Sequence, residues 1–165
     1  MNDLSRRIHD AGSAIQALRG PLLAGEPWPL SDTWGTEPEA DWGPPELLGH
    51  VDEMLPYWID ELEDVLAGDP TAAIPFGRIA SDASRLARID ADRHRPIGDL
   101  LRDIAGGVEQ ASAFADRLSA EDEQRLGVHP SRGDITVRDA IERFLAAHLE
   151  DHVEQLGSIL ARQPA

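Results

Sequence analysis

Two histidines, His148 and His152, lie four residues apart in the last strongly helical segment of the chain, residues 136–160. Because about 3.6 residues make one helical turn, both imidazoles project from the same face of this helix. That face is apolar, with hydrophobic residues at three- and four-residue steps: Val137, Ile141, Phe144, Leu145, Leu149, Leu156, Ile159 and Leu160. Two imidazoles one turn apart on a core-facing surface can bind a single metal ion, so this pair is the first candidate for chemistry.

A buried neutral histidine needs partners for both ring nitrogens, which either hydrogen bonds or a metal can provide. The pair alone leaves both interpretations open. A third histidine, His50, favours the metal, since it lies beside the apolar stripe of a helix predicted over Pro44–Ala67. Prolines are tolerated at the start of this helix, where amide protons have no helical partner. Pro56 should bend the helix just after His50, which either opens a pocket or merely curves the helix.

Length and charge limit the classes of protein to which the chain can belong. Its 165 residues, 41% of them hydrophobic, suffice for one domain over residues 1–165 and are too few for two full-sized domains. No apolar run approaches the roughly 20 residues of a membrane span, and the first ten residues lack a signal-peptide core, so we expect a cytoplasmic protein. With 31 acidic residues, 15 arginines and a net charge of −16, no segment concentrates positive charge. We therefore expect neither nucleic acid nor membrane as a partner.

The sequence contains no cysteine. This excludes disulfides, thiolate nucleophiles and cysteine-bound zinc or iron–sulfur clusters. Histidine, carboxylate and water remain as the available metal ligands.

Three further helices follow from the same apolar spacing: residues 2–19, 78–90 and 96–118. The first should stop at Gly20-Pro21. The last contains Gly106-Gly107, a pair that is tolerated where helices approach closely. No segment alternates with period two for long enough to propose a strand. We therefore predict an all-α four-helix bundle with a long crossover connection that carries a short extra helix.

The connection at residues 25–43 contains Trp28, Trp34 and Trp42. Three tryptophans are too much apolar surface to leave in water, so we expect this segment to fold over one end of the bundle. It either completes the core or forms one wall of a substrate pocket. A second connection, residues 127–134, is predicted as a loop.

Two segments resemble the DinB/YfiT-like superfamily. The first is residues 42–50, in which a tryptophan precedes a Glu-Leu-Leu-x-His stretch that ends at His50. The second is residues 133–156, in which glycine and Thr-Val are followed by a His-x-x-x-His-x-x-Gln-Leu ending that contains His148 and His152. The likeness covers essentially the whole chain in the number and order of helices, while its specific residues are confined to these two segments.

The resemblance implies a divalent-metal site formed by one histidine of the second long helix and two of the last, here His50, His148 and His152. Members of the superfamily are known or supposed to be metal-dependent enzymes, among them transferases and isomerases that act with small thiols. It therefore implies a small-molecule thiol as cosubstrate. Some thiol-dependent relatives carry glutamate at one ligand position, where this chain has histidine. Relatives often pair, which leaves a homodimer open.

Three neutral imidazoles favour zinc, nickel or ferrous iron over magnesium or calcium. They leave at least one coordination position open for water or substrate, which points to catalysis. A metal there would lower the pKa of bound water to roughly 7 or bind the thiolate of a small cosubstrate. A di-iron carboxylate bundle would need Glu-x-x-His pairs on two helices, and the sequence has none.

Carboxylates near the proposed ligands could orient the imidazoles or relay protons, or could simply lie on solvated helix faces: Asp151, Glu53 and Glu154. Apolar neighbours are candidates for the pocket around the site: Trp42, Met54 and Trp58. Of the other histidines, His9 and His94 are expected at the surface, while His129 could approach an open end of the bundle.

These residues predict a divalent-metal-binding protein that works as a metal-dependent enzyme, of the small-thiol S-transferase or hydrolase type, with its catalytic groups unassigned. The alternative is a non-catalytic helical bundle, monomeric or dimeric, which keeps its histidines for packing or for a structural metal.

Overall fold

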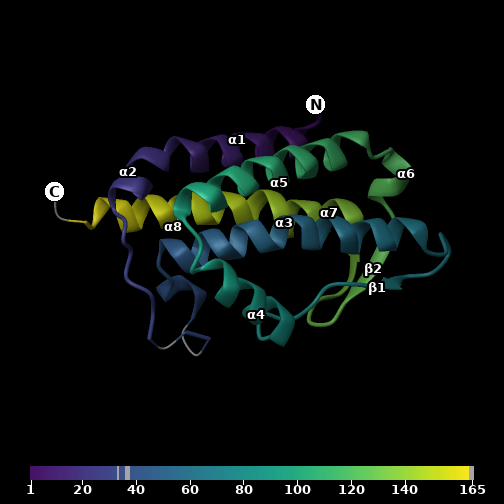
Figure 1. Cartoon of the computed structure of the whole chain (residues 1–165). Helices are drawn as coiled ribbons and strands as arrows, with labels where there is room; N and C mark the ends of the chain where they lie inside the picture. Colours follow the sequence, from purple (N-terminus) through teal and green to yellow (C-terminus); the bar gives the residue numbers. More distant parts are fainter. Residues whose placement is uncertain (33, 36–37, 164–165) are drawn as a thin grey trace.

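The computed structural model describes residues 1–32, 34–35 and 38–163. In these parts of the chain four long helical segments run side by side (Figure 1): α1 Asp3–Ala17, α3 Pro44–Ala67, α5 Ile97–Arg117, and a continuous helix made of α7 Val137–Ile141, a π-helical turn Glu142–Ala146 and α8 Ala147–Ala161. Helix α5 packs against α1 and α3, and α8 also contacts both of these helices. The predominance of helix agrees with the predicted all-α class.

Shorter elements join the long helices: α2 Arg19–Ala24, a 3-10 turn Glu39–Asp41, α4 Ala83–Asp92, α6 Ala120–Glu123, and the strands β1 Ile74–Pro75, β2 Leu126–His129 and β3 Gly133–Thr136. The strands form a sheet in the order β1-β2-β3, with β1 parallel and β3 antiparallel to β2. Helix α4, as predicted, lies in the connection between α3 and α5, and it packs on α3.

The sheet corrects the expectation that the chain forms no strand. Each strand has only two to four residues, too few for an alternating pattern to be recognised in the sequence. The segment predicted as a loop over residues 127–134 is instead a hairpin, with His129 opposite Gly133. Gly133 has a φ of +71°, a conformation that glycine adopts without steric cost.

The start of α1 follows the sequence, whereas its expected end is wrong. Asn2 caps the helix by accepting a hydrogen bond from the Ser5 amide at 2.8 Å. The helical structure does not end at Gly20-Pro21 as expected. After a break at Leu18 it continues as α2, whose first turn contains Pro21. Proline is tolerated there because amide protons in the first turn have no helical partner.

Glycine allows α3 and α5 to approach closely at one point. A Cβ atom added to Gly107 would lie 3.0 Å from Leu55 Cδ1 and 3.2 Å from Leu55 Cβ, so Leu55 would have to shift to make room for it. Its neighbour Gly106 faces open space. Each glycine lowers the stability of the helix. Close packing accounts for glycine at position 107 but not at position 106.

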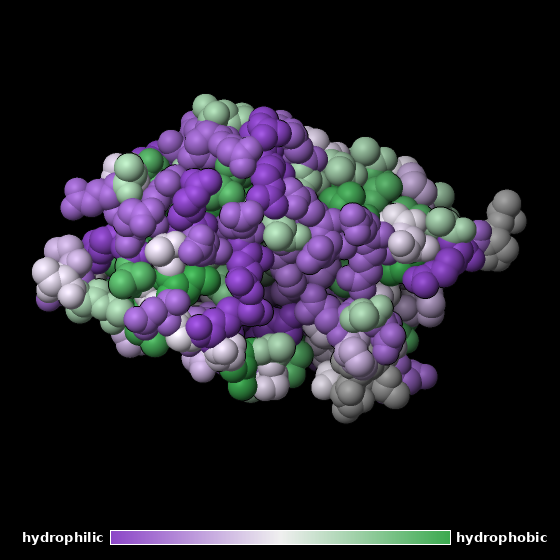
Figure 2. Space-filling model, turned by 180° about the vertical axis from the view of Figure 1, so that it is seen from behind, coloured by the Kyte–Doolittle hydropathy of each residue, from purple (hydrophilic) through white to green (hydrophobic). Residues whose placement is uncertain are grey.

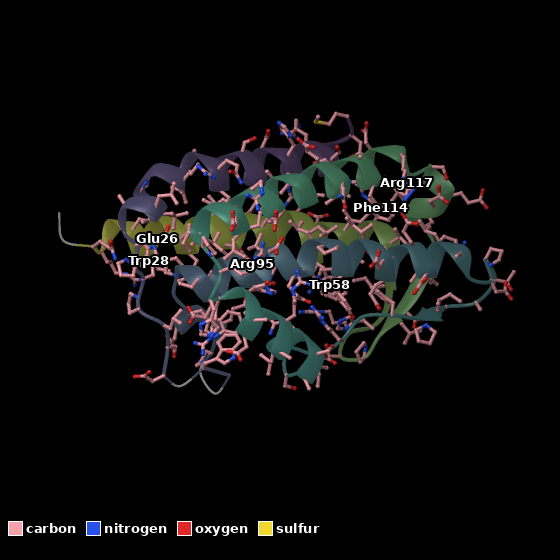
Figure 3. The ribbon with its side chains drawn as sticks, in the orientation of Figure 1. Glu26, Trp28, Trp58, Arg95, Phe114 and Arg117 are labelled. Atoms are coloured by element: carbon pink, nitrogen blue, oxygen red, sulfur yellow. The ribbon has the colours of Figure 1, made fainter. Side chains whose placement is uncertain are left out.

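The tryptophan-rich segment folds onto the core, as predicted. Trp28 and Trp42 are buried, and the partly buried Trp34 packs against the core. Trp28, labelled in Figure 3, donates a hydrogen bond from Nε1 to the carbonyl of Leu22 in α2 at 2.8 Å. Residues 33 and 36–37 of this segment lie outside the described residues.

Charged residues tie α4 and α5 to α3. Arg95, labelled in Figure 3 just before α5, contacts Asp52 at 3.1 Å and Asp92 at 3.2 Å, and it also pairs with Asp103. Asp52 and Asp92 are buried, so their guanidinium partner provides the charge-assisted hydrogen bonds that a buried carboxylate needs.

The face seen in Figure 2 is mostly hydrophilic, as the strongly acidic composition predicts. Within residues 1–32, 34–35 and 38–163, no helix combines the length and hydrophobicity needed to cross a bilayer.

Candidate metal centre

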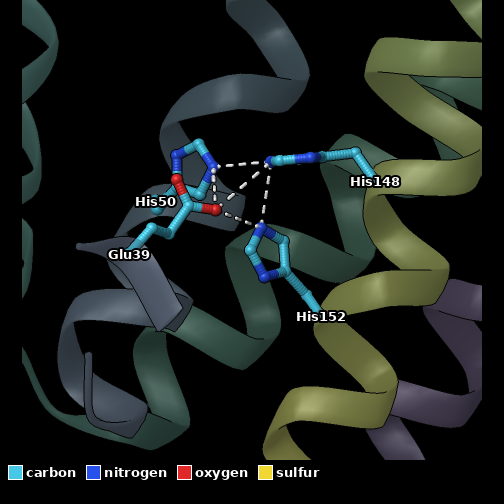
Figure 4. A group of neighbouring side chains, drawn as sticks. All are labelled: Glu39, His50, His148 and His152. Carbon is cyan, nitrogen blue, oxygen red and sulfur yellow. Dashed lines mark hydrogen bonds and ion pairs between the residues drawn. The ribbon is translucent and has the colours of Figure 1, made fainter. Parts of the chain in front are cut away.

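The three histidines singled out by the sequence meet at one point between α3 and α8 (Figure 4). His50 extends from the first half of α3, and His148 and His152 extend from consecutive turns of α8. A carboxylate that the sequence analysis did not select, Glu39, joins them from the 3-10 turn.

The Nε2 atom of His148 lies within hydrogen-bonding distance of both other histidines. His148 Nε2 is 2.9 Å from His50 Nε2 and 3.0 Å from His152 Nε2. Glu39 Oε1 faces the same three nitrogens, at 3.6 Å from His50, 3.6 Å from His148 and 3.2 Å from His152. The four donor atoms therefore form a compact group, all within 4.8 Å of one another.

The size of this group fits a small transition-metal ion. A tetrahedron with edges of about 3.3 Å has its centre about 2.0 Å from each corner, which is the bond length of zinc to imidazole nitrogen or carboxylate oxygen. The five separations given above, 2.9 to 3.6 Å, bracket that edge, and the sixth, between His50 and His152, does not exceed 4.8 Å. Calcium, which binds oxygen ligands at 2.3–2.6 Å, matches neither the distances nor the donor types.

Burial favours the neutral form of two of the imidazoles, His50 and His148, as metal binding requires. The pKa of His148 is lowered to about 3 by burial and then by the neighbouring His152 and His50. Burial also lowers the pKa of His50. For Glu39, burial acts to raise the pKa, but the hydrogen bond with His152 and the adjacent imidazoles outweigh it, so the pKa lies below its ordinary value. His50 and His148 thus favour the neutral form that can bind a metal, beside an ionised Glu39 carboxylate.

Glu53, predicted as a neighbour of the ligands, lies behind His50. Its Oε2 atom is 3.7 Å from His50 Nδ1, and its other oxygen pairs with Arg78. Burial acts to raise the pKa of Glu53, but the contacts with His50 and Arg78 outweigh it and lower the pKa. Arg85 Nη2 also lies 3.4 Å from His50 Nδ1, and Glu53 Oε2 makes no hydrogen bond in the described structure. A modest shift of Glu53 toward Nδ1 would give the carboxylate–imidazole contact that fixes the tautomer of a metal ligand.

Glu39 is held from two directions. Its Oε2 atom accepts a hydrogen bond from Arg85 of α4 at 2.9 Å. Its backbone carbonyl accepts one from the side-chain amide of Gln155 at 3.0 Å, and Gln155 Oε1 is 3.3 Å from His152 Nδ1. Gln155 therefore links a ligand candidate on α8 to the turn that carries the carboxylate.

The remaining predicted neighbours differ in where they lie. Trp42 contacts His50 edge-on, with ring centroids 5.9 Å apart. Met54, on α3, is fully buried in the hydrophobic core of the protein. Asp151 is exposed and lines the pocket over the histidines. Glu154 is exposed on α8 and does not belong to that lining.

A pocket of about 580 Å³ opens over the histidine group. Its apolar side is a group of stacked rings. The ring centroid of Phe144 lies 4.2 Å from that of Trp58 and 5.1 Å from that of His129. His50 and His148 reach the floor of the pocket, and one third of the His148 side chain is exposed. A small molecule can therefore approach the donor atoms from this side.

The π-helical turn lies directly before the two histidines of α8. Such turns insert one extra residue into a helix and occur often at functional sites. This turn carries Phe144, which lines the pocket, and precedes His148. The three- and four-residue spacing of apolar side chains does not distinguish a π-helical turn from an α-helical one, so the sequence did not predict this turn.

The other histidines lie apart from the group. His9 and His94 are exposed, as predicted. His129 is buried in the pocket wall beside Trp58, at the end of β2. No protein-family model matches this chain, and no curated protein matches it.

Proposed function

We propose that this protein binds one divalent transition metal through His50, His148 and His152, and that it is a metal-dependent enzyme. The convergence of three imidazole nitrogens and a carboxylate oxygen, all within 4.8 Å of one another, is the observation that carries the proposal. Structural histidines need one hydrogen-bond partner for each nitrogen, whereas here three Nε2 atoms face the same point.

We further propose that the fold is a DinB-like four-helix bundle. The side-by-side packing of α1, α3, α5 and α8 supports this proposal, as does the short helix α4 in the connection between α3 and α5. The two segments that carry the resemblance supply all three histidines of the group, from α3 and from α8.

The donor set favours zinc, nickel or ferrous iron. Imidazole nitrogen is a ligand of intermediate softness that suits these ions, and one carboxylate does not shift the preference to magnesium or calcium. When bound, such a metal would supply Lewis acidity, either to a water molecule or to the thiolate of a small cosubstrate.

The residues around the group suit a reaction at an accessible metal. Glu53 would hold His50 in one tautomer, and Gln155 would do the same for His152. The pocket would admit the substrate, and its wall of Trp58 and Phe144 would exclude water from one side. A transferase that acts with a small thiol, or a hydrolase, is the reaction type we propose.

Glu39 supports a second candidate function. Catalytic metal sites keep an open position, whereas structural sites are filled by four protein ligands. Glu39 Oε1 is the fourth atom of the donor group. A metal that kept Glu39 as its fourth ligand would be structural; in the enzyme that we propose, Glu39 would leave that position to water or to the thiol.

Cobalt substitution separates the two functions. The protein is loaded with Co²⁺ and titrated with 2-mercaptoethanol while its visible and near-ultraviolet spectra are recorded. We expect a thiolate-to-cobalt charge-transfer band, and we expect Glu39→Gln to bind the thiol more tightly because the competing carboxylate is lost. A spectrum that the thiol leaves unchanged, in both the parent protein and Glu39→Gln, would reject the thiol-transferase proposal. If azide, a small anion that binds open metal positions, also leaves the spectrum unchanged, the site is closed and structural.

A further inference from the structure

The pocket over the histidine group is lined by more basic than acidic side chains, although the chain as a whole is acidic. Four of the chain's 15 basic residues line it, against two carboxylates, Glu39 and Asp151. The lining arginines are Arg78, Arg85, Arg132 and Arg143. In a chain with a net charge of −16, this placement reverses the sign of the charge locally.

Two of these arginines have structural partners. Arg78 pairs with Glu53 and lies over the ring of Tyr57 at 3.6 Å. Arg85 is buried and pairs with Glu39 at 2.9 Å. Both guanidinium groups are therefore engaged in holding the surroundings of the histidines.

The other two are available to a ligand. Across residues 1–32, 34–35 and 38–163, no ion pair involves Arg132 or Arg143. Arg132 lies in the β2–β3 turn with its guanidinium 5.8 Å from the ring of Phe144, and Arg143 lies on the π-helical turn next to that phenylalanine. Two separate elements thus bring free guanidinium groups to one aromatic wall.

The ring stack defines the second part of the ligand. Phe144 and Trp58 are nearly parallel, at an interplanar angle of 5°, and His129 stacks on Phe144 at 24°. All three rings line the pocket together with the two arginines, His50 and His148. Flat rings and conjugated groups pack well against aromatic side chains.

Carboxylates outside the pocket limit the length of the ligand. A neighbouring groove shares Ser131, Arg132 and Arg143 with the pocket. That groove is acidic, since its lining contains Asp134, Asp139 and Glu142. An extended polyanion would meet these carboxylates, whereas a compact anion confined to the inner pocket would not.

We propose that the pocket binds a small organic anion with a flat unsaturated or aromatic body, whose oxyanion group is held by Arg132 and Arg143. A guanidinium group donates two parallel hydrogen bonds to a carboxylate, and it binds a phosphate by the same fork. The body of the ligand lies on Phe144, and its other end reaches the histidine group. This ligand would be the substrate class of the proposed enzyme. The oxyanion site stands without that function, whereas the placement of the reacting end at the metal rests on it.

Matched ligands test the oxyanion requirement. Binding of benzoate, benzamide and phenyl phosphate is measured by calorimetry on the metal-loaded protein and on the metal-free protein. Benzamide has the shape of benzoate without its charge, so we expect it to bind at least about tenfold more weakly. If phenyl phosphate binds more tightly than benzoate, the inference holds and the natural acid group is a phosphate. Equal binding of benzoate and benzamide, or no binding of either anion at millimolar concentration, would overturn the inference.

Matched variants test the two arginines. We expect the double variant Arg132→Gln/Arg143→Gln to bind benzoate at least about tenfold more weakly. The control Arg19→Gln/Arg162→Gln removes the same charge from exposed arginines outside the pocket lining and should leave binding unchanged. Equal affinities of the two double variants would overturn the inference. Metal content is measured separately on each protein. Arginine-dependent benzoate binding in a protein that takes up no metal would reject the proposed metal centre and keep the anion site.

Discussion

The side-chain amide of Gln155 donates a hydrogen bond to the backbone carbonyl of Glu39 at 3.0 Å, across 116 residues of sequence. This contact joins the last helix to the tryptophan-rich segment. Because Gln155 also contacts His152 Nδ1, one side chain sets both the orientation of an imidazole and the position of the turn that carries the carboxylate. The candidate metal centre is therefore built from three parts of the chain rather than from the two helices alone.

Loss of the Gln155 amide should weaken metal binding. In Gln155→Ala, His152 loses the partner of Nδ1 and the Glu39 turn loses its tie to α8, so we expect metal affinity to fall by about tenfold to 100-fold. Competition with a chelating dye measures the affinity. Ser158→Ala, an exposed change on the same helix, is the control. Equal affinities of the two variants would remove Gln155 from the site.

Replacing Glu53 by glutamine should have a similar effect through His50. The amide cannot supply the negative charge that faces His50 Nδ1, and it also breaks the pair with Arg78. We expect about a tenfold loss of metal affinity, with the fold retained by circular dichroism. Asp60→Asn, at an exposed position of the same helix, should leave the affinity unchanged. A Glu53→Gln protein with full affinity would show that this carboxylate only neutralises Arg78.

Glycine substitutions test the packing of α3 on α5. We expect Gly107→Ala to destabilise the protein by about 1–3 kcal/mol, because the added methyl group meets Leu55. Gly106→Ala should instead stabilise it by about 0.5–1 kcal/mol, since the position is helical and faces open space. Urea unfolding of both variants gives the free energies. Effects of the same sign and size at the two positions would mean that the helices do not meet at Gly107.

Acid should destabilise the metal-free protein through His148. Its pKa is about 3 in the folded chain and near 6.5 when free, so between these values the unfolded chain binds the proton and the folded chain does not. Stability therefore falls as the pH drops below 6.5. After allowance for the partial exposure of His148, we expect a loss of about 1–2 kcal/mol by pH 5.

Urea unfolding of the metal-free protein at pH 7 and pH 5 measures this loss. His148→Gln should show a smaller pH dependence than the parent protein, while His94→Gln, at an exposed position, should match the parent. A His148→Gln variant with the pH dependence of the parent would place the titration elsewhere.

The predictable part of the site is the part that lies on regular helices. Helical periodicity alone puts His148 and His152 on one face, and the resemblance adds His50; the structure brings these three together. Glu39 lies on an irregular segment, whose path depends on where its tryptophans pack, and no spacing rule connects it to the histidines. Arg132 was missed for the same reason, because it lies in the hairpin that the short strands concealed. Arg143 lies within a predicted helix, but its spacing gave no sign that it lines the pocket.

The fold shows the same division. Long amphipathic helices were predicted within a few residues, since burial of one face dictates their pattern. Local sequence patterns do not predict features that depend on tertiary contacts. These features are the break at Leu18, the π-helical turn and the pairing of β2 with its neighbouring strands.

The metal content of the purified protein tests the central claim most directly. Elemental analysis should find one equivalent of zinc, nickel or iron per chain, lost in His50→Ala, His148→Ala and His152→Ala and retained in His9→Ala and His94→Ala. A parent protein that takes up no stoichiometric transition metal, even after incubation with these ions, or one whose metal survives all three ligand substitutions, would contradict the account.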